Sequence, residues 1–328
     1  MLQSGKSLYF HPPIAKPRLR VICPRHHPEE KRQMGLLVEV GLPLALAIIM
    51  LSLGLGLTID DFKRVALRPK AFGIGFLAQV IIVPLAAFAL AHIAGLPPEL
   101  SVGLMILSLC PGGVTSNMMS KIANGDVALS VSLTAVVSLI LMFTVPFAIA
   151  FSVDYFMGSD APPVNIAQMA ISMFLITAVP VLIGVALRHF APVFVSHIEG
   201  AATGFAFILF VLIVVAALAL NWNLFVSQLP ILGPTVITLN LILIVAAFLL
   251  ALILGLSAQE RRTVAIEAGV QNSTVGIALG AILAGPTVSG FSEFALPAAA
   301  YGITMYVVTL PVVAWFRYAS RKEVVAHG

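Results

Sequence analysis

Long apolar stretches alternate along the chain with short segments of charged or turn-forming residues. Each stretch is about 20 residues or longer, the length that a helix needs to cross a bilayer. The apolar runs are continuous, whereas strands of a membrane barrel alternate apolar and polar positions over about ten residues. We therefore expect nine transmembrane helices. The predicted spans are 36–58, 71–95, 101–120, 127–151, 166–187, 200–220, 234–256, 264–283 and 295–316.

The composition agrees with this pattern. Of the 328 residues, 60% are apolar and 10% are charged, whereas about 25% of the residues in a soluble domain are charged. This excludes a soluble enzyme, a nucleic-acid-binding protein and a disordered protein. The predicted organisation is a basic, proline-rich tail over 1–35, a transmembrane domain over 36–316 and a cytoplasmic tail over 317–328.

The basic residues fall in every second loop. Beyond the first 33 residues, all Lys and Arg residues follow spans 1, 3, 5, 7 and 9, and the loops after spans 2, 4, 6 and 8 have none. Positive residues favour the cytoplasmic side of a membrane. We therefore expect a protein of the plasma (inner) membrane with its C-terminus in the cytoplasm and its N-terminus outside.

The first 33 residues contradict this orientation, because they are basic as well. They lack the apolar core that a signal peptide needs. Met34 stands directly before the first predicted span. Two explanations stay open. Residues 1–33 precede the true start of the protein, or they form a genuine outside tail and the basic residues of the other loops determine the orientation in spite of it.

One acidic residue within the predicted spans indicates a functional site. An ionisable group at membrane depth is costly and usually marks the path of a substrate or an ion. Glu39 lies near the outer end of span 1, four residues into the predicted span, where its side chain can reach the interface. Glu267 lies within span 8, and no span has Lys or Arg at its middle. Its carboxyl group is therefore expected to be protonated, hydrated or bound to a cation.

The residues after Glu267 add further oxygen atoms. The segment Glu267–Ser273 holds four oxygen-bearing side chains in seven positions. Gly269 and Gly276 weaken the helix, and an unwound segment exposes backbone carbonyls. Together these groups suit a hard cation such as sodium. The alternative is that the polar side chains join packed helices.

Span 3 contains a second predicted helix break, Cys110-Pro-Gly-Gly-Val-Thr-Ser-Asn117. Proline removes a backbone donor and clashes with the preceding turn. Broken helices at membrane depth line a cavity or are buried in protein, and their free carbonyls and new N-termini form ion sites. A simple proline kink is the alternative.

The two predicted breaks resemble each other. Gly113-Val-Thr-Ser-Asn117 and Gly269-Val-Gln-Asn-Ser273 both place polar residues after Gly-Val, and each lies in the second-last span of its half. The pattern predicts an inverted repeat of four and five spans with two crossed discontinuous helices, as in secondary transporters.

Two more polar sets lie within the predicted spans. Ser130 and Thr134 are four positions apart, so they share a face of span 4. Gln79 lies among apolar residues of span 2, five positions before Pro84. Either set can serve an ion path. The alternative for the hydroxyls is a hydrogen bond to a carbonyl of their own helix, and the alternative for Gln79 is a packing hydrogen bond.

With these motifs the sequence resembles the bile acid:sodium symporter family, which includes bacterial homologues of the intestinal and hepatic bile acid carriers. The resemblance covers about residues 36–316 and is most specific at Cys110–Asn117, Gly125–Thr134 and Ile266–Ser273. It implies core and panel domains and two sodium sites.

The resemblance also implies which residues form the sites. The first sodium site would consist of Ser116, Asn117, Ser130, Thr134 and Glu267. The second would consist of Gln79, Glu267, Gln271 and the backbone carbonyls of Ala268 and Val270. The residues expected at the substrate cavity are Asn272, Pro111, Gly112 and Gly113.

We therefore expect an all-α polytopic membrane protein that is not an enzyme. It would carry an organic anion, such as a bile acid or a related carboxylate, together with sodium by alternating access. Its partners would be the anion, sodium ions and the bilayer, without nucleic acid and without a cofactor besides sodium as coupling ion. Two alternatives stay open: a proton-coupled or uncoupled organic-anion exporter, and a membrane sensor that transports nothing.

Overall fold

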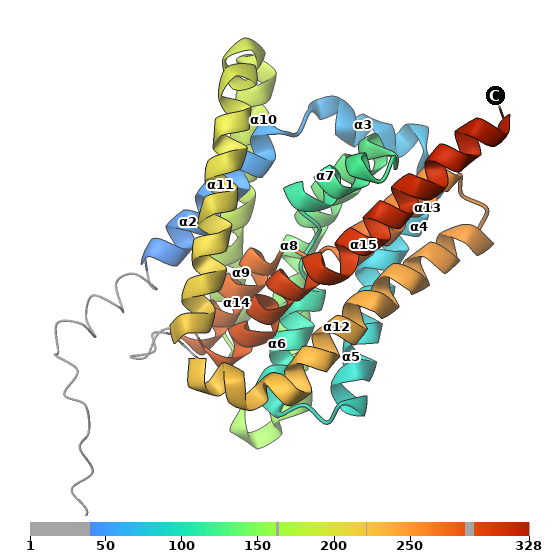
Figure 1. The fold of residues 1–328 in the computed structure, drawn as a ribbon. Helices are drawn as coiled ribbons and strands as arrows, with labels where there is room; N and C mark the ends of the chain where they lie inside the picture. Colours follow the sequence, from blue (N-terminus) through green and yellow to red (C-terminus); the bar gives the residue numbers. More distant parts are fainter. Residues whose placement is uncertain (1–39, 162–163, 221, 286–291, 328) are drawn as a thin grey trace, which may run out of the picture.

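The structure is a computed structural model that describes residues 40–161, 164–220, 222–285 and 292–327. These residues form helices and no strand, as expected of an all-α protein (Figure 1). The predicted tail over 1–35, with Met34, lies outside the described residues, and so does Glu39.

The helices follow the predicted spans, with several extended at their ends. They are α2 (Leu42–Leu55), α3 (Ile59–Leu67), α4 (Pro69–Leu77), α5 (Val83–Ile93), α6 (Pro98–Ser108), α7 (Val114–Ile122), α8 (Val127–Met157), α9 (Ile166–Met173), α10 (Val179–Phe190), α11 (Pro192–Leu220), α12 (Trp222–Ile253), α13 (Ala258–Gly269), α14 (Ser273–Ala284) and α15 (Leu296–His327). The π-helical turns η2 (Ala78–Ile82) and η4 (Phe174–Ala178) join α4 to α5 and α9 to α10, and the short 3-10 turns are η3 (Gly158–Asp160) and η5 (Glu293–Ala295). The expected cytoplasmic tail over 317–328 continues α15 as far as His327.

Six helical stretches in the described part of the chain are long and apolar enough to cross a membrane. Two more candidate spans are counted if each bent pair of helices is one span. These pairs are α2 with α3, bent by 63°, and the two halves of α8, bent by 61°. The predicted span 101–120 is not among them, because it is divided into α6 with 11 residues and α7 with 9. The protein is a multi-pass membrane protein with six to eight candidate spans among the described residues, and the count of nine stays a prediction.

The turn η2 brings Gln79 into the protein interior. It directly precedes α5, which has Pro84 in its first turn. Proline cannot donate a backbone hydrogen bond, and a wider π-type turn accommodates the missing bond. Gln79 is 2% exposed there.

The helices α2, α10 and α11 pack together at one side of the molecule (Figure 1). Glycines bring the backbones of α2 and α10 into contact. A Cβ atom on Gly184 would lie 2.6 Å from the Leu51 carbonyl oxygen, and one on Gly54 would meet the carbonyl of Val181. Small residues allow this close approach between helices in membranes.

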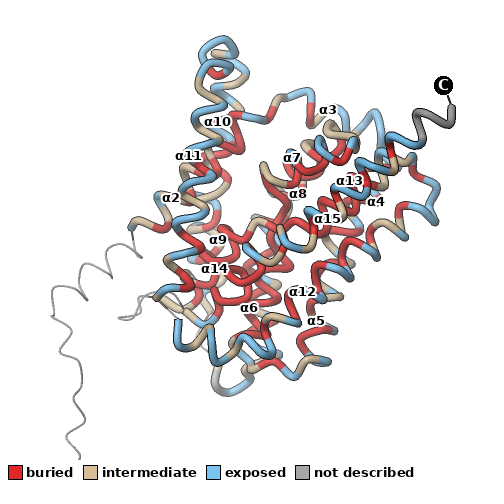
Figure 2. The backbone as a smooth tube through the Cα atoms, viewed as in Figure 1, coloured by how far each residue is buried: buried red, intermediate tan, exposed pale blue. Residues whose placement is uncertain are grey.

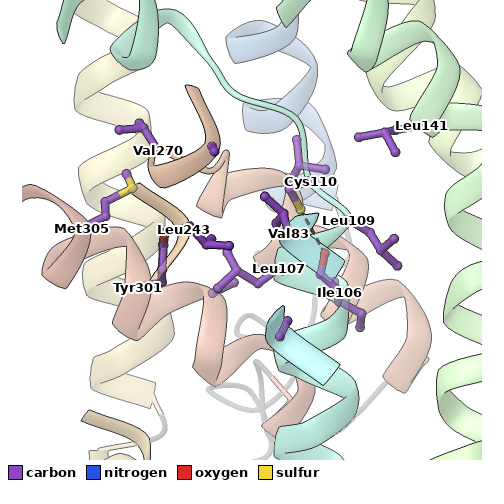
Figure 3. Packing of buried hydrophobic residues seen from close by; sticks show 14 of the residues in the cluster. Val83, Ile106, Leu107, Leu109, Cys110, Leu141, Leu243, Val270, Tyr301 and Met305 are labelled. Carbon is purple, nitrogen blue, oxygen red and sulfur yellow. Dashed lines mark hydrogen bonds between the residues drawn. The ribbon is translucent and has the colours of Figure 1, made fainter. Parts of the chain in front are cut away.

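The other helices surround the two predicted breaks. The helix α12 packs along α13 and α15, α6 packs on α8, and α14 packs on α15. Figure 2 shows the buried residues concentrated at this centre, whereas the outer faces of α11 and α12 are exposed. Apolar side chains fill the centre, and the buried Cys110 thiol donates to the Ile106 carbonyl at 3.2 Å (Figure 3). The two breaks, which are the most polar segments of the predicted spans, thus lie at the centre of the molecule.

Candidate ion and substrate site

The two helix breaks touch each other. Residues 109–113 separate α6 from α7, and residues 270–272 separate α13 from α14. The backbone N–H of Asn272 donates to the Pro111 carbonyl at 2.9 Å. Two segments that are far apart in the sequence therefore form one site.

Glu267 is the only acidic residue within a predicted span that the described part of the chain includes, and it is 3% exposed. The Ser130 hydroxyl oxygen lies 2.8 Å from both Glu267 Oε2 and Asn117 Oδ1. The Thr134 hydroxyl donates to Glu267 Oε1 and lies 3.4 Å from Asn117 Oδ1. Residues from α7, α8 and α13 are thus brought together around one carboxyl group.

Ser116 completes this cluster at the start of α7. Its hydroxyl accepts from the Gly113 N–H at 3.1 Å and donates to the Gly113 carbonyl at 2.7 Å. A Cβ atom on Gly112 would lie 2.9 Å from Ser116 Oγ and would collide with the Glu267 carboxylate. The five side chains expected at the first sodium site are therefore neighbours in the fold.

A second polar cluster connects the two breaks on the η2 side. The Gln79 side-chain amide donates to the Cys110 carbonyl and to Gln271 Oε1, both at 2.9 Å. The Gln271 amide in turn donates to the Ala268 carbonyl at 2.8 Å. Val270 lies within the second break in an extended conformation, with φ −110° and ψ 100°. The residues expected at the second sodium site are therefore adjacent as well.

Several polar groups at the two breaks lack a charged or hydrogen-bonding partner. The ion pairs found among the described residues do not include Glu267. Gln79 Oε1 and Ser273 Oγ are buried and have no hydrogen-bond partner. A buried polar atom without a partner is costly, so each one needs an explanation such as a bound ligand or ion.

A cavity of about 560 Å³ lies beside the breaks. Its walls are α2 and α11 on one side, and α7, the second break and α15 on the other. The N-termini of α7 and α14 contribute Val114 and Thr115, and Ser273 and Thr274. Helix N-termini have a partial positive charge and bind anions through free N–H groups. The cavity can therefore hold an anion without a Lys or Arg in its wall.

The structure separates the four residues expected at the substrate cavity. Asn272 and Gly113 line it. Pro111 lines a smaller void between α2, α8 and α10, and Gly112 lies against Glu267 as described above. The first break therefore faces the cavity only at its C-terminal end.

Three residues of the site were not predicted from the sequence. Asn240 and Tyr301 are both fully buried, and each donates to the Gly269 carbonyl, at 2.5 and 2.7 Å. Thr309 donates to Asn240 Oδ1 at 3.3 Å. The available signal was Asn240 itself, a single amide between leucines in a predicted span.

The profile of the Sodium Bile acid symporter family matches residues 43–228, more than half of the chain. The chain belongs to the sodium bile acid symporter family. This confirms the resemblance that the motifs predicted. The match includes the first break, Gln79 and Thr134 and ends before Glu267.

Relatives of this symporter-family chain are transporters rather than enzymes. The chain is 34% identical to the "Uncharacterized sodium-dependent transporter YocS" of Bacillus subtilis over 239 residues, 73% of each protein. It is 31% identical to the ileal sodium/bile acid cotransporter of Homo sapiens over 247 residues, 73% of this chain and 68% of the human protein. It is 30% identical to the probable chloroplastic sodium/metabolite cotransporter BASS1 of Arabidopsis thaliana over 240 residues, 72% of this chain and 58% of that protein.

Proposed function

We propose that this protein is a sodium-coupled symporter that carries an organic anion across the plasma (inner) membrane by alternating access. The observation that supports this most directly is the buried Glu267. It has no basic partner among the described residues, and hydroxyl and amide groups from α7 and α8 surround it. At membrane depth such a carboxylate needs a cation.

The donor set favours sodium over a transition metal. Glu267, Ser130, Thr134 and Asn117 offer only oxygen atoms for a cation, and so do the backbone carbonyls of the breaks. Hard cations prefer oxygen ligands, whereas imidazole and thiolate select transition metals. No group of three His, Cys, Asp or Glu side chains suited to a metal occurs in the described parts of the chain.

We propose nine spans, counting α6 with α7 as one broken span, arranged as an inverted repeat of four and five. An amide side chain holds the end of each break in the same way. Gln79 donates to the carbonyl of Cys110, 31 residues later, and Asn240 donates to the carbonyl of Gly269, 29 residues later. In this scheme α2, α9, α10 and α11 form the panel, and the other spans form the core.

The loops after spans 1, 3 and 7 meet on one side of the molecule, which supports the proposed orientation. Arg68 lies 3.1 Å from Asp126 and 3.4 Å from Glu260. These three loops carry basic residues, and basic loops favour the cytoplasm. The C-terminus would then be cytoplasmic and the N-terminus outside.

The cavity and the charge of the site support an anionic substrate, such as a bile acid or a related carboxylate. Two sodium ions, the Glu267 carboxylate and a monocarboxylate would together be neutral. The N-termini of α7 and α14 would face the carboxylate of the substrate. The core would move against the panel around this site, and sodium would favour the closed state by binding to it more tightly.

The test is sodium-dependent uptake of cholate into proteoliposomes. We expect Glu267→Ala and Gln79→Ala to abolish the uptake, because each removes an oxygen ligand from a proposed site. Ser152→Ala is the matched control, since its buried hydroxyl bonds only to its own helix at Ala148. Sodium-dependent uptake that is unchanged in Glu267→Ala would contradict the proposal.

The same assay separates the alternatives. The Glu267 carboxyl group could bind a proton in place of sodium, because it is buried and forms none of the ion pairs found among the described residues. Flux driven by a pH gradient without sodium would favour a proton-coupled exporter. Ligand binding without any flux would favour a sensor.

A further inference from the structure

The C-terminal end of α13 is held by side chains from two other helices. The last carbonyls of a helix have no intrahelical donors and need partners elsewhere. The Ala268 carbonyl accepts from Gln271 at 2.8 Å. The Gly269 carbonyl accepts from Asn240 of α12 and from Tyr301 of α15. Two successive carbonyls are therefore fixed toward different partners.

The contact with α12 depends on the missing side chain of Gly269. A Cβ atom there would collide with Ile244, one turn beyond Asn240. The glycine lets the end of α13 lie directly on α12, within reach of Asn240. The Asn240 amide also donates to the Tyr301 hydroxyl at 2.7 Å, and Thr309 donates to the Asn240 side-chain oxygen. All three side chains are fully buried, so the arrangement is well defined.

The direction of the Gly269 carbonyl also sets that of the next one. Val270 is extended, with φ −110° and ψ 100°, and consecutive carbonyls point in opposite directions along an extended backbone. Because the Gly269 carbonyl is held on the side of α12 and α15, the Val270 carbonyl points away from these helices.

We infer that Asn240 and Tyr301 are positioning residues for the second sodium ion. By holding the Gly269 carbonyl, they direct the carbonyls of Ala268 and Val270 toward Gln79 and Gln271. Neither side chain is itself a ligand. The inference rests on the proposed function, because it concerns the proposed second sodium site. In the second half of the chain, Asn240 is the counterpart of Gln79. Gln79 holds the first break by donating to the Cys110 carbonyl.

The experiment measures the apparent sodium affinity of the full chain in detergent. The thermal unfolding midpoint is followed during titration with NaCl, with choline chloride keeping the ionic strength constant. Bound sodium raises the stability of the folded state, so the titration gives a Kd. We expect Tyr301→Phe to raise the apparent Kd about fivefold, the value of one neutral hydrogen bond. Asn240→Ala should have a larger effect, on the order of tenfold.

Two other variants complete the design. Thr309→Val preserves the shape of the side chain and removes only the bond that orients Asn240, so we expect a rise of about twofold. Thr235→Val is the control: it lies on α12, is buried, and bonds only within its own helix to Ile231. Its Kd should equal that of the wild type.

The outcomes distinguish a failure of the positioning role of Asn240 and Tyr301 from a failure of the proposed function. Variants that unfold earlier in choline chloride but retain the wild-type sodium Kd would show that the network only joins helices, and would overturn the inference while the proposed function stands. A wild-type midpoint that does not respond to sodium would overturn both. At saturating sodium we expect Tyr301→Phe to transport cholate at nearly the wild-type maximal rate, because no ligand is lost.

Discussion

Glu267 can occupy its position only because Gly112 has no side chain. A Cβ atom at Gly112 would collide with the carboxylate and would lie 2.9 Å from Ser116 Oγ. The backbone of the first break thus passes directly beside the only acidic group of the proposed sodium sites. The glycine is required for space rather than for an unusual backbone conformation.

We expect Gly112→Ala to displace the Glu267 carboxylate and to abolish sodium-dependent transport, although no ligand is removed. Overpacking of this kind costs about 1–3 kcal/mol of stability. The control is Gly73→Ala in α4, where a Cβ atom meets nothing within 4 Å. It should retain transport and gain about 0.5–1 kcal/mol, because alanine favours the helix. Sodium-dependent uptake measures the transport of both variants, and thermal unfolding measures their stability. Wild-type transport by Gly112→Ala would show that the carboxylate has more room than the structure indicates.

At this scale the sequence predicted chemistry better than contacts. Glu267 and its polar neighbours were recognisable because charged and amide side chains are costly in apolar spans. The roles of Asn240 and Tyr301 were not, because they act on a backbone carbonyl and that carbonyl has no signature of its own in the sequence. The placement of Pro111 away from the cavity likewise depends on how the break turns.

The breaks and turns explain how far the elements could be predicted. Long apolar runs predicted the helices, since a helix satisfies its own backbone groups in lipid. The boundaries were less accurate: α12 begins at Trp222, before the expected residue 234. The helix includes Pro230 and Pro234, so neither proline ends it. The π-type turn before Pro84 has no periodicity of its own and was not foreseen.

The contact between α2 and α10 provides a prediction for helix packing. In Gly54→Ala the added methyl group would meet backbone atoms of Val181, which cannot rotate away as a side chain can. We expect a loss of about 1–3 kcal/mol of stability, seen as a lower unfolding midpoint in detergent. Gly204→Ala in α11 is the control, because its Cβ atom would meet nothing within 4 Å. An equal midpoint for Gly54→Ala and the wild type would mean that the two helices pack less closely.

Across the whole molecule, one face of α15 leads from the cavity toward the C-terminus. Tyr306 and Leu310 line the cavity. A second hollow of about 390 Å³ shares Leu310 and Ile122 with it and continues to Arg317 and Arg321. Both arginines are exposed, and on the proposed orientation they lie at the cytoplasmic opening.

We expect Arg317→Gln to raise the KM for cholate presented from the cytoplasmic side about threefold at low ionic strength, because a positive charge near the opening attracts anions. The difference should disappear near 1 M salt, where charges are screened within about 3 Å. Lys63→Gln is the control: it removes a positive charge from α3, where Lys63 pairs with Asp60 at 2.9 Å. Counterflow from vesicles at low and high salt measures both variants. A KM that is insensitive to the Arg317 charge would exclude a role in attracting the anion.

The hydrogen bond from Asn272 to Pro111 joins the two broken helices where they meet. A change in the shape of one break would strain or break this hydrogen bond to the other, and Glu267 belongs to both proposed ion sites. On the proposed function, the first ion to bind would order part of the site for the second, so the second would lose less conformational entropy. By linkage, each ion would strengthen the binding of the other by the same factor. The two sodium ions would then bind cooperatively, and partly loaded protein would be rare.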